Sequence, residues 1–332
     1  MATSRHLRAL NEGAALEQLL ARGSLTRGEL RELTGLSKPT ASELLRRLVE
    51  SGLAVVTGHV TGRPGPNAEI YAPHPEAAHV AAISLRVKSL SVAICDLVGG
   101  VQTEFQAADI SEVLDRLAAG PLRPAHIQLA VPGSYDPATD TIRHIDTPGW
   151  DRPGLIGELR TRVDCSLDVD NDVNLVAVAE RQFQNGPFTL LWVDEGLGLA
   201  IDLGGQLLRG ASGGAGEIGY LPVPGAGGGD LQDLIGAPNL DGLTLDEIAE
   251  RLVVPLVAII AIIDPPRIVL AGSVARAGGE ALREAVEKAM ALRPFNVPVE
   301  LTKVDGDPVL TGALRAGLAT VHRRLIQGDG TL

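Results

Sequence analysis

Hydrogen-bonding and basic side chains gather at the start and along one flank of a short predicted helix that runs from Lys38 to about Ser51. Hydroxyl groups and cations of this kind contact the base edges and phosphates of DNA. A helix that presents them from its N-terminal end is typical of a recognition helix in a DNA groove. The candidate DNA-binding residues on this helix are Ser37, Lys38, Thr40, Ser42, Arg46 and Arg47.

A helix-turn-helix pattern positions these side chains. The apolar spacing predicts one buried stripe on the second helix, formed by Ala41, Leu44, Leu45 and Leu48. Before it stands the turn Thr34-Gly35-Leu36-Ser37. Gly35 suits a positive φ, Ser37 is a good N-cap, and Pro39 is tolerated in the first helical turn. The alternative is an ordinary helical hairpin with a solvated basic face.

The flanking segments complete a winged helix-turn-helix within residues 1–75. A first helix is expected from His6 to about Arg22, and two strands are expected at 53–57 and 68–71. The connection between the strands holds Gly62-Arg63-Pro64-Gly65-Pro66, whose stiff, extended chain places Arg63 to contact a minor groove or the phosphate backbone. A proline-rich linker with an incidental arginine is the alternative.

The charge distribution favours DNA binding by the N-terminal segment. The net charge of the chain is −12, yet residues 1–75 hold nine Lys/Arg against seven Asp/Glu, while the remainder holds 20 against 34. Only the segment with the helix-turn-helix pattern is therefore basic on balance.

Two cysteines exclude a disulfide framework, and no apolar run approaches the length of a membrane span. A cytoplasmic protein with no membrane partner is expected.

From about residue 76 the pattern becomes α/β, with strands alternating with helices as far as residue 332. We expect two lobes, roughly 76–185 and 186–310, with the C-terminal helix returning to the first lobe. Three polar, glycine-rich clusters stand out in this part. They are Val131-Pro132-Gly133 with Asp146-Thr147-Pro148-Gly149-Trp150, then Val169-Asp170-Asn171-Asp172-Val173-Asn174, then Gly213-Gly214-Ala215-Gly216-Glu217-Ile218-Gly219-Tyr220.

These clusters, preceded by the winged helix, resemble the ROK family of repressors, open reading frames and sugar kinases, and specifically its transcriptional regulators. The resemblance covers nearly the whole chain. It implies a two-lobed, actin-like sugar-kinase fold with a sugar in the cleft, commonly as a dimer or a tetramer. In family kinases the aspartate matching Asp172 is the catalytic base and the glutamate matching Glu217 holds sugar hydroxyls. The sugar-binding residues that the resemblance implies are Asp146, Asn171, Asp172, Glu217, Tyr220 and Gln232.

Several positions depart from the family pattern. Asp146 replaces a usual asparagine, Tyr220 a histidine, and Gln232 a glutamate. An alternative role for Asp172 and Glu217 is therefore purely architectural, with Asp172 capping a helix that begins at Val173 and Glu217 satisfying buried amides.

The phosphate-binding and zinc motifs of the family also differ here. The segment matching the D-x-G-x-T phosphate loop reads Ser84-Leu85-Arg86-Val87-Lys88-Ser89, and the second one, Gly196 to Ala200, lacks its last glycine. A phosphate cradle needs unobstructed backbone N–H groups, so we expect no ATP binding and no kinase activity. The zinc segment, Gly225 to Gln232, has no cysteine, so no zinc is expected. The predicted function is a DNA-binding repressor with a homo-oligomerising, sugar-sensing domain; the alternative is a sugar kinase with a DNA-binding appendage.

Overall fold

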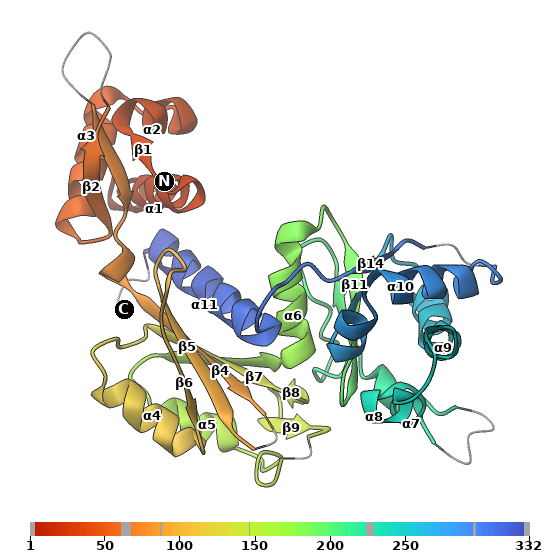
Figure 1. The fold of residues 1–332 in the computed structure, drawn as a ribbon. Helices are drawn as coiled ribbons and strands as arrows, with labels where there is room; N and C mark the ends of the chain where they lie inside the picture. The colour runs from red at the N-terminus through yellow and green to blue at the C-terminus, as the bar shows by residue number, and fades with distance from the viewer. Residues whose placement is uncertain are drawn as a thin grey trace. The chain divides into compact units, whose positions relative to one another are not determined.

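A computed structural model describes residues 4–60, 68–86, 88–145, 147–223, 229–294 and 297–328 (Figure 1). The chain divides into two compact units. Unit 1 comprises residues 1–129, 159–168 and 314–332, and unit 2 comprises residues 130–158 and 169–313. The domain and lobe limits expected from the sequence stay predictions.

The N-terminal module of unit 1 combines three helices with a small antiparallel sheet. The helices are α1 (Ser4–Arg22), α2 (Arg27–Thr34) and α3 (Lys38–Glu50), and the strands, in sheet order, are β1 (Leu25–Thr26), β3 (Glu69–Pro73) and β2 (Ala54–His59). The expectation of a sheet made by the hairpin alone was incomplete, because β1 also pairs with β3. Thr26 explains the extra strand: as the N-cap of α2 it keeps an extended backbone (φ −83°, ψ 162°) that can join a sheet. Arg63 and the rest of the segment 61–67 lie outside the described residues.

Local chemistry explains the helix-turn-helix. Gly35 ends α2 with φ +68°, a left-handed conformation that suits glycine. The Ser37 hydroxyl caps α3 by accepting a hydrogen bond from the Thr40 amide, and proline occupies the first turn. The predicted stripe, Ala41, Leu44, Leu45 and Leu48, is buried. The positive φ, the N-cap and the stripe predicted from the sequence are therefore confirmed.

A five-stranded sheet, most of whose residues belong to unit 1, follows the N-terminal module. Its strands, in sheet order, are β10 (Ser166–Asn171), β7 (His126–Val131), β4 (His79–Leu85), β5 (Leu90–Asp96) and β6 (Val101–Ala107). Every residue of β5 is buried, which is typical of a strand covered on both faces. Helix α4 (Ile110–Ala119) packs against β5 and β6 (Figure 1).

Unit 2 is built on the sheet β12 (Leu197–Asp202), β11 (Phe188–Val193), β13 (Ile268–Ala271) and β14 (Val299–Leu301), given in sheet order. Helices α9 (Leu245–Ile263) and α10 (Ser273–Met290) pack on each other, and their apolar side chains form one hydrophobic core with those of the four strands.

The remaining helices and strands of the two units are β8 (Ser134–Asp136), β9 (Thr141–Arg143), α5 (Leu155–Thr161), α6 (Asp172–Glu180), α7 (Leu231–Ile235), α8 (Ala237–Leu240), α11 (Pro308–Gln327) and the 3-10 helices η1 (Pro75–Ala77), η2 (Arg181–Phe183) and η3 (Ile218–Tyr220).

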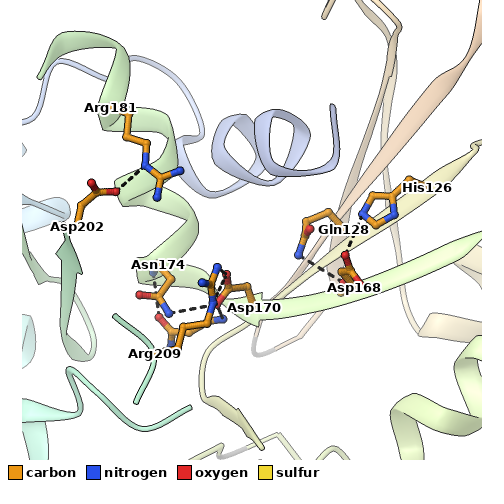
Figure 2. Close-up of polar contacts among 9 residues, drawn as sticks. His126, Gln128, Asp168, Asp170, Asn174, Arg181, Asp202 and Arg209 are labelled. Carbon is orange, nitrogen blue, oxygen red and sulfur yellow. Dashed lines mark hydrogen bonds and ion pairs between the residues drawn. The ribbon is translucent and has the colours of Figure 1, made fainter. Parts of the chain in front are cut away.

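A buried histidine joins two strands of unit 1. His126 on β7 is fully buried, and its Nδ1 lies 2.7 Å from the Ser166 hydroxyl on β10. Burial lowers the pKa of His126, partly offset by the negative charge of Asp168 (Figure 2). His126 therefore acts as a neutral core side chain.

Candidate functional site

Helix α3 presents the predicted DNA-binding residues at its first turns and along one flank. Ser37 and Lys38 are exposed, and Thr40 and Ser42 are partly buried. The hydroxyl of Ser42 donates to the Lys38 carbonyl and accepts from the Arg27 guanidinium at 3.3 Å. Arg27 starts α2 and adds a cation beside the predicted set. No pattern in the sequence points to Arg27, because it lies 15 positions before Ser42 and the two residues share no local motif.

Acidic neighbours hold the two arginines later in α3. Arg46 pairs with Glu43 at 2.7 Å and also with Glu50, while Arg47 pairs with Glu43 at 2.8 Å and with Glu12 at 3.0 Å. Hydrogen bonds from Arg46 and Arg47 lower the pKa of Glu43 to about 2. A phosphate would have to compete with these carboxylates for the arginines. Arg46 and Arg47 stay predicted DNA contacts, with Glu43 as the group that modulates them.

The described members of the predicted sugar-binding set all belong to unit 2, while Asp146 lies outside the described residues. Asn171 is the N-cap of α6: its side-chain oxygen accepts from the Asn174 amide, and its side-chain nitrogen donates to the Gly133 carbonyl at 3.2 Å. Asn171 therefore ties the second sequence cluster to the first.

Asp172 does not cap the following helix in the way that was expected. Helix α6 begins at Asp172 itself, one residue earlier than predicted, and the capping side chain is Asn171. The expectation that Asp172 caps a helix starting at Val173 was wrong, because an asparagine one position earlier already has the extended backbone that a cap requires (φ −63°, ψ 142°). Asp172 accepts a hydrogen bond from the Val173 amide at 2.7 Å.

Glu217 lies in the third cluster, on a loop that approaches β12 closely. Gly216 has φ +97°, and a Cβ there would lie 1.9 Å from the Leu199 carbonyl oxygen. Only glycine fits this approach, which explains the glycines before Glu217. Burial raises the pKa of Glu217, opposed by the nearby His144 and by a hydrogen bond with Ser134. The expected architectural role, in which Glu217 satisfies buried amides, stays a prediction.

Tyr220 and Gln232 flank the same region. The Tyr220 ring is half exposed and lies 4.8 Å, centroid to centroid, from the His144 ring. The Gln232 side-chain oxygen accepts from the Leu197 amide at 3.5 Å and would lie 3.2 Å from a Cβ at Gly219. Of the described members of the predicted set, Asn171 thus contacts the first cluster at Gly133, whereas Tyr220 contacts His144 and Gln232 contacts Leu197, both outside the three clusters.

Arg209 is a further polar residue of unit 2 that the sequence analysis missed. Its guanidinium forms a two-nitrogen ion pair with Asp170, with a shortest distance of 2.6 Å, and Asp170 also accepts from the Asn174 side chain at 3.1 Å (Figure 2). The Arg209 carbonyl accepts from the Ala215 amide at 3.1 Å. Arg209 therefore links the loop before Glu217 to the strand end before Asn171. An arginine 39 residues from its partner gives no local signal.

The part of the two units that the structure describes offers no candidate metal site. Among the described residues, no group of three or more His, Cys, Asp or Glu side chains could hold a metal ion. Part of the segment matching the family zinc site, residues 224–228, lies outside the described residues. The absence of zinc therefore stays a prediction.

None of the helices in the described part of the chain combines the length and the hydrophobicity that crossing a lipid bilayer requires.

Together, these features define a winged helix-turn-helix module joined to an α/β body with glycine-rich polar loops. Residues 9–63 match the MarR family and residues 103–234 match the ROK family. The chain therefore carries a MarR-type winged helix-turn-helix domain and a ROK family domain, which confirms the resemblance inferred from the motifs.

Individual proteins agree with this assignment. The chain is 24% identical over 237 residues to the xylose repressor of Caldicellulosiruptor bescii, covering 65% of this chain and 59% of that protein. It is 30% identical over 128 residues to a glucokinase of Halalkalibacterium halodurans, covering 36% and 39%. The chain thus spans less than two thirds of the length of these relatives.

A solved structure extends the similarity to nearly the whole fold. The crystal structure of a ROK family transcriptional regulator, a homologue of the Escherichia coli Mlc protein, has a TM-score of 0.75 at 16% identity, covering 98% of this chain and 100% of that chain. Agreement at this identity shows the fold, and it confirms the predicted combination of a winged helix-turn-helix with an actin-like ROK body.

Proposed function

We propose that this protein is a DNA-binding transcriptional repressor whose ROK domain binds a sugar effector. The observation that carries the proposal is the capped recognition helix α3, which buries its apolar stripe and leaves Lys38 and Ser37 exposed at its N-terminal end. A helix of this kind enters the major groove of operator DNA. The xylose repressors that this chain resembles support the same role.

The sugar-binding part of the proposal rests on the contacts of unit 2. Asn171 comes from the second cluster, and Glu217 and Tyr220 come from the third. Asn171 contacts Gly133, Glu217 lies near Ser134, and Tyr220 contacts His144. Amide and carboxylate groups beside an aromatic ring are the groups that bind a polyhydroxylated ligand.

We infer that the protein is not a kinase. Strands β4 and β5 pair as far as Leu85 and Leu90, and the Arg86 amide donates to the Ser89 carbonyl across their connection. The described residues of this short connection, Arg86, Lys88 and Ser89, stand at the position of the family phosphate loop. The similarity to a glucokinase supports the competing proposal, a sugar kinase with a DNA-binding appendage.

The proposal also covers the location, the DNA partner and the oligomeric state of the protein. The repressor acts in the cytoplasm on double-stranded operator DNA, as a homodimer or homotetramer that matches a two-fold symmetric site. It requires neither zinc nor ATP.

The DNA-binding role is tested by mapping the genomic binding sites of the full-length protein and measuring affinity for a recovered site by fluorescence anisotropy. Lys38→Ala is expected to weaken binding severalfold and to reduce the salt dependence by about one phosphate contact. Lys288→Ala removes the same charge from α10 in unit 2 and serves as the matched control. Equal affinity for recovered and scrambled sites would contradict the proposal.

The enzymatic alternative is tested separately with ATP and either D-glucose or D-xylose. The proposal expects no sugar phosphate beyond the background given by Asp172→Asn. Phosphorylation that this substitution abolishes would establish a kinase.

A further inference from the structure

His144 stands out in unit 2 because its backbone takes an unusual conformation beside the predicted sugar-binding residues. Its φ is +57°, a region that few non-glycine residues adopt. The side chain is exposed, so core packing gives no reason for this conformation. Residues held in such conformations cluster at ligand sites, where the surrounding structure maintains them.

Two contacts fix the orientation of the His144 ring. Its Nδ1 lies 3.0 Å from the hydroxyl of Ser134, which is 1% exposed. Its ring packs against the Tyr220 ring in a tilted arrangement, with 4.8 Å between the ring centroids and 39° between the ring planes. Gly133 makes room for this arrangement, because a Cβ there would lie 2.6 Å from the Arg143 carbonyl oxygen and 3.3 Å from that of His144.

The remaining nitrogen of the ring has no protein partner that the described residues supply. With Nδ1 engaged by Ser134, Nε2 is left on the opposite side of an immobilised, exposed ring. Glu217 is close enough for the two side chains to interact electrostatically, and Ser134 also hydrogen-bonds with Glu217. A ring nitrogen that is fixed, exposed and beside a carboxylate and an aromatic face can donate to or accept from a ligand hydroxyl.

We propose that His144 contacts the effector directly and determines which sugar is accepted, with Nε2 hydrogen-bonded to one ligand hydroxyl and the His144 and Tyr220 rings lining the same side of the site. This inference rests on the proposed sugar site and adds to it a residue outside the family motifs. His144 selects among neutral sugars by requiring a hydroxyl at one ring position.

Two amide substitutions separate a ligand contact from a structural role. The side-chain amide of asparagine reaches the position of Nδ1, and that of glutamine reaches the position of Nε2. His144→Asn thus keeps a group for Ser134 and removes the group for the ligand, whereas His144→Gln does the reverse. Asparagine tolerates positive φ well, so backbone strain does not explain a loss of binding in His144→Asn.

The measurement is calorimetric titration of the full-length protein and both variants with D-xylose and D-glucose, followed by the monodeoxy analogues of whichever sugar binds. His144→Asn is expected to lower affinity about tenfold, as loss of one hydrogen bond would. His144→Gln should stay within about threefold of the original chain. The analogue that lacks the contacted hydroxyl cannot form the hydrogen bond with Nε2. It should therefore bind the original chain and His144→Asn with equal affinity, and this equality identifies the hydroxyl.

The outcomes distinguish this inference from the proposed function. If the original chain binds a sugar and His144→Asn binds it equally well, the inference is overturned and the sugar site stands. A stronger loss in His144→Gln than in His144→Asn would make the ring only a support for Ser134, which also overturns it. If the original chain binds neither sugar nor any of their analogues, the proposed sugar site and the inference both fail.

Discussion

Glu43 on the recognition helix and Glu217 in the ROK domain show how differently the two regions treat a carboxylate. The Glu43 side chain is 45% exposed, and hydrogen bonds from Arg46 and Arg47 lower its pKa to about 2. Glu217 is partly buried, and its burial raises its pKa above the ordinary value despite the nearby His144. The first carboxylate is held charged by its own helix, and the second loses hydration in a loop assembled from distant segments.

This contrast separates two ways of building a site. On α3 the partners of Glu43 lie three and four residues away, so one turn of helix brings them together. In unit 2 the partner Ser134 lies far before Glu217 in the chain, and only the folded loops unite them. Substitutions on α3 should therefore have local effects, whereas substitutions in the loops of unit 2 should affect stability and ligand binding together.

The largest effect is expected from Gly216→Ala. The added Cβ would meet the Leu199 carbonyl at 1.9 Å, so backbone must move, and the free energy of unfolding should fall by about 3–5 kcal/mol. Gly205→Ala is the matched control, since Gly205 has a similar φ of +103° and no atom lies within 4 Å of the point that its Cβ would occupy. The control should cost only about 1–2 kcal/mol in denaturant unfolding. Equal losses would show that the close approach of the Glu217 loop contributes nothing.

Arg209→Ala should have the next largest effect. Asp170, with its side chain 10% exposed, would lose a two-nitrogen ion pair, and we expect a loss of about 1–3 kcal/mol after allowing for the 52% exposure of Arg209. Arg152→Ala, which breaks the solvent-exposed pair with Glu158, should lower the stability much less. Chemical denaturation of both variants compares the two pairs, and a larger loss from Arg152→Ala would reverse the interpretation.

A smaller effect, confined to DNA binding, is expected from Glu43→Gln. The substitution frees Arg46 and Arg47 from a shared carboxylate, so affinity for DNA should rise severalfold and its dependence on salt should steepen by about one phosphate contact. Glu284→Gln makes the same charge change on an exposed position of α10 and should leave DNA affinity unchanged. Weaker DNA binding by Glu43→Gln would indicate that the carboxylate itself contacts a base.

The smallest effect is a difference in pH dependence between Glu217→Gln and Glu43→Gln. The folded state holds the Glu217 proton more tightly than the unfolded state, so this group's stabilising contribution declines as pH rises above 4.5. Glu217→Gln should therefore gain thermal stability relative to the original chain between about pH 4.5 and 7. The Glu43 shift has the opposite sign, so its contribution is present above pH 4.5 and lost as pH falls toward 2. Thermal melts across this range measure both, and parallel slopes for the two variants would contradict the contrast.

The helix-turn-helix was the most predictable part of the chain because its determinants are neighbours in sequence. Gly35, Ser37 and the stripe from Ala41 to Leu48 act through single turns of backbone, and each behaves as its residue type suggests. Strand β1 escaped prediction because Leu25 and Thr26 pair with Tyr71 and Ile70, which lie far along the chain.

The polar loops of unit 2 were predictable as motifs, and their contacts were not. The glycines around Glu217 indicated close backbone approach, but the sequence does not say that the approached group is the Leu199 carbonyl. His144 and Arg209 lie outside the motifs that signalled a sugar site, so no pattern pointed to them.

The sequence by itself determined the helix-turn-helix, the α/β alternation and the family, because helical periodicity, capping and glycine requirements act over a few residues. Only the tertiary structure decided that Glu12 of α1 pairs with Arg47 on the recognition helix, that Asn171 rather than Asp172 caps α6, and that His144 lies against Tyr220. Those arrangements depend on side-chain conformation and on contacts between distant segments, where the energies of burial, ion pairing and hydrogen bonding are settled in three dimensions.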